Sequence, residues 1–225
     1  MRYSQKSIMD KETVVTSIRE ISIIPALRMF SADDARFAAD AVAAAGIPIV
    51  EVTMTVPGAL EVIGELVRHT AQVIVGAGTV FDLATARRCL DAGVGFLTST
   101  GLDLSVVEFA VKAGVAVLPG ALTPSEVMAA WKAGADFVKI FPVAQLGGPA
   151  YIKALKAPFQ HVPFVAAGGV TQANAVDFIR AGATALGIGK DLIPQDAIQH
   201  RQAHRIKELA HRYLGMIKEA RTPYE

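Results

Sequence analysis

The chain has 225 residues, of which 52% are hydrophobic and 19% are charged, and this composition suits a globular fold. Its 22 basic and 21 acidic residues give a formal net charge of +1, so we expect neither a nucleic acid nor an anionic membrane as a partner. The single cysteine, Cys89, excludes a disulfide scaffold and a multi-cysteine metal site, and it favours a reducing, cytoplasmic compartment.

The apolar excess of the chain predicts buried strands rather than membrane spans. Mean hydropathy is +0.39, yet no stretch free of charges and glycine is long enough to cross a bilayer. Charged residues interrupt the first twenty positions, which leaves no apolar core for a signal peptide. Strands that are buried on both faces would account for the excess.

In chain order, the first predicted element is a helix over Lys11–Ile21. Apolar runs then predict about eight strands, and most of them follow an Ala-Gly pair. Glycine is favoured just past a helix C-terminus because the left-handed conformation costs it little, so each pair predicts a helix end. The predicted strands cover residues 23–27, 47–52, 72–75, 94–98, 115–118, 135–141, 162–167 and 183–188, and the pairs are Ala45-Gly46, Ala92-Gly93, Ala113-Gly114, Ala133-Gly134 and Ala181-Gly182.

Helices fill the segments between these strands. Ser31, Thr123 and Thr171 are candidate N-caps ahead of helix-forming residues, and a long amphipathic helix is predicted over 200–220. About eight βα units in roughly 200 residues match a closed (β/α)8 barrel at the compact end of its size range. We therefore expect one domain over residues 1–225. An open doubly wound sheet is the structural alternative.

Lys139 lies in one of the apolar runs, where a charged amine needs an explanation. Burial of an ammonium group is costly, so a buried lysine tends to lose its proton and become a nucleophile near neutral pH. Glu51 is a second charged residue inside an apolar strand, and together they offer an amine nucleophile and an acid/base. The alternatives are a lysine that reaches solvent at a strand end and a purely structural ion pair.

Other polar residues and glycines fall at the predicted C-terminal strand ends, where barrels carry their chemistry. Glycines after the seventh and eighth strands could bind phosphate through backbone N–H groups, although turn glycine is the simpler interpretation. These residues are Arg28, Thr79, Thr98, Ser99, Thr100, Gly168, Gly169, Gly189 and Lys190.

No cofactor or metal is predicted. Gly76-Ala-Gly78 lacks the further glycine and the later acidic residue of a dinucleotide fingerprint. His200, His204 and His211 lie on the predicted final helix, where an i, i+4 pair could chelate a metal, but a solvated helix face is the simpler interpretation.

Seven motifs, in order along the chain, resemble the class I 2-keto-3-deoxy-6-phosphogluconate (KDPG) / 4-hydroxy-2-oxoglutarate (KHG) aldolases. The likeness runs from about Ile21 to Ile193 and does not depend on any single motif. The motifs are Glu51-Val-Thr, Gly76-Ala-Gly-Thr79, Leu118-Pro-Gly120, Thr123-Pro-Ser-Glu126, Val138-Lys-Ile-Phe-Pro142, Tyr151-Ile-Lys-Ala-Leu155 and Gly168-Gly-Val170.

The resemblance implies a metal-independent, homotrimeric (β/α)8 enzyme that needs no cofactor and acts on a small keto acid, as in the Entner–Doudoroff pathway. Lys139 would form a Schiff base with the keto acid, and Glu51 would shuttle protons. The remaining residues would contact substrate: Arg28 and Thr79 at the carboxylate and keto end, Gly168, Gly169, Gly189 and Lys190 at the phosphate, and Ser99, Thr100 and Phe141 elsewhere.

The chain departs from the family pattern at four positions. Thr55 stands where some members carry a carboxylate-binding arginine, so Arg28 would hold the carboxylate alone. Thr100 replaces a proline, Ala167 a threonine and Lys190 a serine, and these changes concern specificity at the aldehyde end.

The expected reaction is reversible cleavage of KDPG to pyruvate and glyceraldehyde 3-phosphate. KHG, which gives glyoxylate, and the phosphogalactonate analogue are alternative substrates. Two alternatives from other classes stay open: a phosphate-binding barrel isomerase that uses Glu51 without an imine, and a barrel without catalytic activity.

Overall fold

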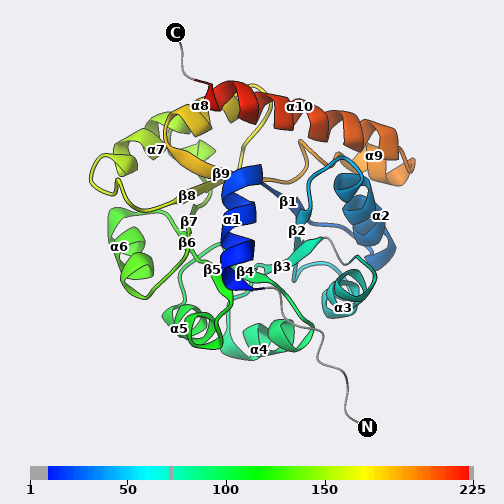
Figure 1. Ribbon diagram of the computed structural model, residues 1–225, viewed down its shortest axis with the longest axis horizontal. Coiled ribbons are helices and arrows are strands. Elements are labelled where there is room, and N and C mark those ends of the chain that lie inside the picture. Colours follow the sequence, from blue (N-terminus) through cyan, green and yellow to red (C-terminus); the bar gives the residue numbers. More distant parts are fainter. Residues whose placement is uncertain (1–9, 71–72, 223–225) are drawn as a thin grey trace.

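A computed structural model describes residues 10–70 and 73–222. Nine strands in these ranges form one parallel sheet in the order β5-β4-β3-β2-β1-β9-β8-β7-β6. β5 and β6, at the two ends of this order, are separated in the chain only by Pro119, so the sheet closes into a ring (Figure 1). The strands are β1 Ile23–Leu27, β2 Ile49–Thr53, β3 Ile74–Gly78, β4 Phe96–Thr98, β5 Ala116–Leu118, β6 Gly120–Ala121, β7 Val138–Ile140, β8 Phe164–Ala167 and β9 Ala183–Ile188.

Helices surround this ring and alternate with its strands, so the predicted (β/α)8 barrel is confirmed and the open-sheet alternative is wrong (Figure 1). The helices are α1 Lys11–Ile21, α2 Ala32–Ala43, α3 Ala59–His69, α4 Leu83–Asp91, α5 Leu104–Ala113, α6 Pro124–Lys132, α7 Pro149–Lys156, α8 Ala175–Arg180, α9 Gln195–Gln199 and α10 Ala203–Arg221, with a 3-10 turn, η1, over Ala144–Leu146.

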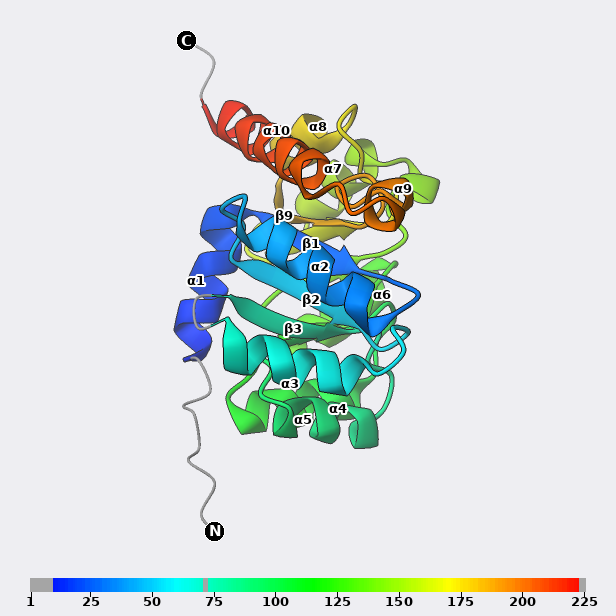
Figure 2. The ribbon, with the colours of Figure 1, turned by 90° about the vertical axis from the view of Figure 1, so that its right-hand side faces the viewer.

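The additional helix α1 lies across one end of the barrel (Figures 1 and 2). Val14 and Ile18 on its inner face are fully buried, and they join the cluster of side chains that fills the barrel from the strands. Lys11 Nζ lies 2.9 Å from Asp136 Oδ1 and fixes the start of the helix beside the beginning of β7. This packing seals the N-terminal end of the barrel.

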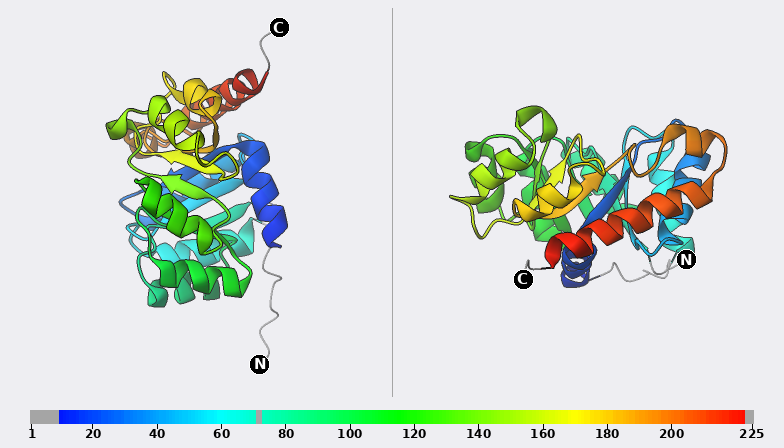
Figure 3. Two further views of the ribbon diagram at one scale, coloured as in Figure 1. Left: turned by 90° about the vertical axis from the view of Figure 1, so that its left-hand side faces the viewer. Right: turned by 90° about the horizontal axis from the view of Figure 1, so that it is seen from above.

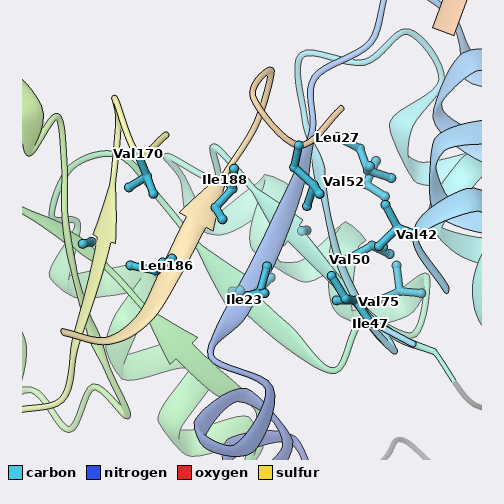
Figure 4. Packing of buried hydrophobic residues seen from close by; sticks show 14 of the residues in the cluster. Ile23, Leu27, Val42, Ile47, Val50, Val52, Val75, Val170, Leu186 and Ile188 are labelled. Carbon is cyan, nitrogen blue, oxygen red and sulfur yellow. The ribbon is translucent and has the colours of Figure 1, made fainter. Parts of the chain in front are cut away.

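Side chains alternate between the two faces of each strand. In β2, Val50 and Val52 point outward and pack with Val42 of α2 and with Leu27, as Figure 4 shows. Ile49, which precedes Val50, points to the opposite face and belongs to the cluster inside the barrel. Burial on both faces explains why the amino-acid sequences of the strands are nearly continuous apolar runs.

The same alternation separates an apolar floor from a polar upper layer inside the barrel. The inward floor residues include Ile24, Ile49, Phe96 and Phe137. Two residues further along, β5 has Leu118 at the inward position, whereas the inward positions of seven strands are polar or small: Ala26, Glu51, Gly76, Thr98, Lys139, Ala167 and Gly187. The chemistry-bearing layer therefore lies at the C-terminal ends of the strands.

The structure confirms the predicted helix ends. The glycines of all five Ala-Gly pairs have positive φ, between 70° and 105°. Ser31 caps α2, and Thr123 forms a capping box with Glu126 at the start of α6. The Thr171 prediction is wrong, because α8 begins after Asn174, whose side chain instead accepts a hydrogen bond from Thr171 N.

Several strands are shorter than predicted, β7 most of all, and the boundaries of β3 and of the final helix also differ. β3 runs on through Gly76, Ala77 and Gly78, because their backbone pairs in register with β2; Gln72, the predicted start, lies outside the described residues. The predicted helix over 200–220 corresponds to α10 but begins at Ala203, and the short helix α9 ends at Gln199, so His200 lies between the two helices. His200 and His204 are therefore not an i, i+4 pair on one helix.

Candidate active site

Lys139 and Glu51 meet inside the upper part of the barrel. Lys139 Nζ lies 3.3 Å from Glu51 Oε2 and 3.2 Å from Thr98 Oγ1, to which it donates a hydrogen bond. Lys139 is 6% exposed and Glu51 is 4% exposed, so the pair is largely removed from solvent. The interpretation of Lys139 as a strand-end lysine that reaches solvent is wrong. The arrangement places an amine within hydrogen-bonding distance of a carboxylate that can exchange its proton.

Thr98 was predicted to lie at the end of a strand, but no contact with substrate or with Lys139 was predicted for it. It follows the inward residue Phe96 by two positions, so the period of two along a strand was the available signal. Phe141, which was predicted, lies with its ring centroid 6.0 Å from Lys139 Nζ. Its ring therefore forms an apolar wall beside the amine.

Thr79 has an unusual backbone and an unsatisfied side chain. It follows β3 with φ of 63°, a conformation that is costly for a β-branched residue, and its buried Oγ1 has no hydrogen-bond partner among the described residues. Strained residues of this kind concentrate at binding sites. The hydroxyl group is thus available to a ligand.

Arg28 directly follows β1, is exposed, and makes no ion pair within the described ranges. β1 and β2 are paired with Leu27 opposite Val52, so Arg28 lies beside Thr53 at the same end of the barrel as Glu51. A free guanidinium there can bind a carboxylate.

Thr55, at a position where the resemblance implies an arginine in some family members, takes part in an ordered chain of hydroxyl groups. Thr53 Oγ1 donates to Leu27 O at 3.1 Å and lies 2.7 Å from Thr55 Oγ1. Because Thr53 has one hydroxyl proton, Thr55 must be the donor in the second bond. Its remaining lone pairs can accept a hydrogen bond, but they cannot bind a carboxylate.

Ser99 and Thr100 form the turn after β4. Ser99 Oγ donates to Gly101 O at 2.5 Å and accepts from Gly120 N at 3.2 Å, so its hydroxyl group ties β4 to β6. A Cβ on Gly120 would lie 2.3 Å from the Thr100 carbonyl carbon. The structure therefore gives both residues a structural role in closing the ring.

Gly168 and Gly169 form a concave turn after β8, with φ of 83° and 91°. A Cβ on Gly168 would lie 2.8 Å from Pro142 Cα, and a Cβ on Gly169 would lie 2.3 Å from Ala144 Cβ. Gly168 O accepts a hydrogen bond from Ala144 N, which turns the N–H of the same peptide group, that of Gly169, the other way. Neither glycine N–H donates to another described residue, and two such groups in succession can bind an anion.

Gly189 and Lys190 form the neighbouring turn after β9. β8 and β9 pair with Ala167 opposite Gly187, so the two turns are adjacent. Lys190 is exposed and makes no ion pair within the described residues. Its ammonium group can therefore reach an anion that binds at this edge of the barrel.

The other chemically reactive groups do not form a second site. Burial raises the pKa of Cys89 to about 11, which leaves its thiol protonated and unreactive. In the described ranges, no group of three or more His, Cys, Asp and Glu side chains could hold a metal ion. None of the described helices is long and apolar enough to cross a membrane.

A buried lysine paired with a glutamate at the open end of a (β/α)8 barrel defines a barrel enzyme that can form an imine with a carbonyl substrate. A family model described as "KDPG and KHG aldolase" matches residues 14–209. The chain belongs to this family of aldolases, which are carbon–carbon lyases.

Named relatives support the same assignment. The chain is 30% identical to the 2-dehydro-3-deoxy-phosphogluconate aldolase of Pseudomonas aeruginosa over 92% of this chain and 94% of that protein. It is 30% identical to the KHG/KDPG aldolase of Escherichia coli K12 over 84% and 88%. The KDPG aldolase of Legionella pneumophila, solved with pyruvate as a covalent carbinolamine intermediate, superposes with a TM-score of 0.82 at 27% identity over 87% of this chain and 95% of that one.

Proposed function

We propose that this protein cleaves 2-keto-3-deoxy-6-phosphogluconate reversibly into pyruvate and glyceraldehyde 3-phosphate, with Lys139 as the imine-forming residue. The observation that carries the proposal is the contact of Lys139 Nζ with Glu51 Oε2 at 3.3 Å. A carbonyl carbon that reaches Nζ there is within range of a group able to take up and return protons.

Imine formation uses Lys139, with Thr98 holding its amine in place. The neutral amine of Lys139 attacks the C2 keto carbon, and the carbonyl oxygen gains a proton to give a carbinolamine. Loss of water then leaves a protonated imine. Thr98 holds Nζ through its hydroxyl oxygen and so fixes the direction of attack.

Cleavage follows from the charge on the imine nitrogen. Glu51, as a carboxylate, takes the proton of the C4 hydroxyl group, through a water where the substrate requires it. The C3–C4 bond breaks, its electron pair moves into the imine to give an enamine, and the aldehyde leaves. Glu51 then returns the proton to C3, and hydrolysis of the resulting pyruvate imine regenerates Lys139.

The two ends of the substrate would bind at opposite sides of this centre. Arg28 and the unsatisfied hydroxyl group of Thr79 suit the carboxylate. The free N–H groups of Gly168 and Gly169 suit the phosphate, together with Lys190. These two glycine turns favour KDPG over KHG, because KHG has no phosphate group that would reach them.

A coupled pyruvate-release assay over a panel of keto acids tests the substrate assignment. KDPG is expected to give the highest kcat/KM, above KHG and the phosphogalactonate analogue. A clear preference for KHG would refute the phosphate assignment but leave the imine mechanism in place. No pyruvate from any substrate would instead favour an isomerase or a barrel without catalytic activity.

We also propose a homotrimer in the cytoplasm. Phe30 is 78% exposed and Phe81 is 54% exposed, and they follow β1 and β3 at the same end of the barrel. Large exposed apolar side chains support burial by a second copy. Cys89, a buried free thiol, suits a reducing compartment. Light scattering coupled to gel filtration should give three times the chain mass, and a monomer would refute the trimer.

A further inference from the structure

Asp191 joins three separate parts of the chain beside the proposed phosphate turns. It follows Lys190 in the turn after β9. Its Oδ1 atom accepts a hydrogen bond from Gln172 N, in the loop after β8, at 3.2 Å. The same oxygen accepts a second bond from the hydroxyl group of Tyr213 on α10. One carboxylate oxygen thus connects both turns to a helix on the outside of the barrel.

Tyr213 is a rigid anchor for this connection. It is fully buried among the apolar residues outside the barrel, on a helix that packs against α8 and α2 (Figure 3). Burial, and then the hydrogen bond to Asp191, raise the pKa of the phenol well above its usual range, so the hydroxyl group stays a donor. A buried hydroxyl without a partner is costly, which holds Tyr213 to Asp191.

The loop that Asp191 holds is also the loop that presents the glycine N–H groups. Within it, Asn174 Nδ2 donates to Gly169 O at 3.0 Å and Asn174 Oδ1 accepts from Thr171 N at 2.8 Å. These bonds make residues 169–174 one folded unit. Fixing Gln172 therefore fixes the orientation of the glycine peptides relative to the turn of Gly189 and Lys190.

We propose that Asp191 and Tyr213 are positioning residues that favour phosphorylated substrates. They do so by keeping the turn of Gly168 and Gly169 in a fixed position relative to the turn of Gly189 and Lys190. This inference rests on the proposed function. Asp191 contributes through the acceptor oxygen Oδ1 rather than through its charge, because both hydrogen bonds converge on that atom. The other oxygen, Oδ2, accepts no hydrogen bond from a described residue.

That convergence permits a direct test with three variants. Asp191→Asn keeps an oxygen acceptor and removes the charge, whereas Asp191→Ala removes both. Tyr213→Phe deletes only the hydroxyl group from a ring that stays packed. Tyr151→Phe is the matched control, because its hydroxyl group donates to Leu122 O on another part of the barrel.

Steady-state kinetics with KDPG and KHG should separate the variants. Asp191→Ala and Tyr213→Phe should raise KM for KDPG by roughly 3- to 10-fold, because a loosened turn mispositions its donors. Their kcat for KDPG and both constants for KHG should stay at the values of the unaltered protein. Asp191→Asn should restore the KM for KDPG, and Tyr151→Phe should change neither constant.

Three results would overturn the inference: an unchanged KM for KDPG in Asp191→Ala, equal losses on both substrates, or a KM in Asp191→Asn as high as in Asp191→Ala. The last result would show that the charge matters and the acceptor does not. If the unaltered protein releases pyruvate from neither substrate, the proposed function itself fails and the inference fails with it.

Discussion

Glu51 and Gly78 are in direct contact across β2 and β3, and a Cβ on residue 78 would lie 2.1 Å from Glu51 Oε1. Real Cβ atoms essentially never approach another atom so closely, so the carboxylate keeps its place beside Lys139 only because residue 78 is glycine. The second glycine of the Gly76-Ala-Gly78 motif thus provides space for the acid/base rather than a turn for a nucleotide.

Gly78→Ala should therefore displace the Glu51 carboxylate from Lys139 and lower kcat by roughly 10²-fold, since a misplacement of about 1 Å can have that effect. Gly215→Ala on α10 is the control, because a Cβ there meets no atom within 4 Å. Steady-state kinetics measure kcat for both variants, and circular dichroism checks that both are folded. A kcat in Gly78→Ala equal to that of the control would show that the position of Glu51 does not limit the reaction.

Glu51→Gln keeps the shape of the side chain and its hydrogen bonding but removes proton exchange. Cleavage should fall by roughly 10²- to 10⁴-fold while the fold and oligomeric state persist. The measurement is kcat for pyruvate release together with Tm. If Glu51 is only a structural counter-ion of Lys139, Tm should fall and kcat should stay close to that of the unaltered protein.

Lys190→Ser removes the ammonium group from the proposed phosphate turn and introduces the serine that the resemblance implies there. A charge-assisted contact to a phosphate dianion contributes on the order of 1.5 to 3 kcal/mol. KM for KDPG should then rise by roughly 10- to 100-fold, since about 1.4 kcal/mol is tenfold in affinity, and KHG cleavage should stay nearly unchanged. Equal effects on both substrates, or none on either, would remove Lys190 from the site.

Activity should survive exhaustive treatment with EDTA, because an imine at Lys139 can serve as the electron sink in place of a metal ion. The assay is pyruvate release before and after chelation. Loss of activity that zinc or magnesium restores would indicate a metal-dependent aldolase.

The sequence predicted the layer that carries Lys139 and Glu51 because strand alternation is local. Glu51 lies two residues after the inward Ile49, and Lys139 lies two residues after the inward Phe137. The same rule places Thr98, two residues after the inward Phe96, in this layer and could have indicated its contact with Lys139. Ser99 shows the limit of the rule, since its hydroxyl group accepts a hydrogen bond from Gly120 N, 21 residues further along the chain, and this contact depends on how the ring closes.

Contacts between distant segments could not be predicted. Tyr213 and Asp191 are 22 residues apart, and nothing in the sequence indicates their hydrogen bond. The final helix was likewise predicted to begin at residue 200. Its start at Ala203 becomes visible only in three dimensions, where Arg201 adopts φ of 51° and pairs with Asp33 and Asp34 in the first turn of α2. Tertiary contacts of this kind override helix propensity.

Trapping with borohydride tests the central claim most directly, because reduction makes an imine permanent at the residue that forms it. Incubation with pyruvate and borohydride should attach one reduced pyruvate per chain, and peptide mapping should locate it on Lys139. Lys139→Arg should abolish the adduct. An adduct on Lys153 or Lys156, or no adduct from a protein that still releases pyruvate, would contradict the account.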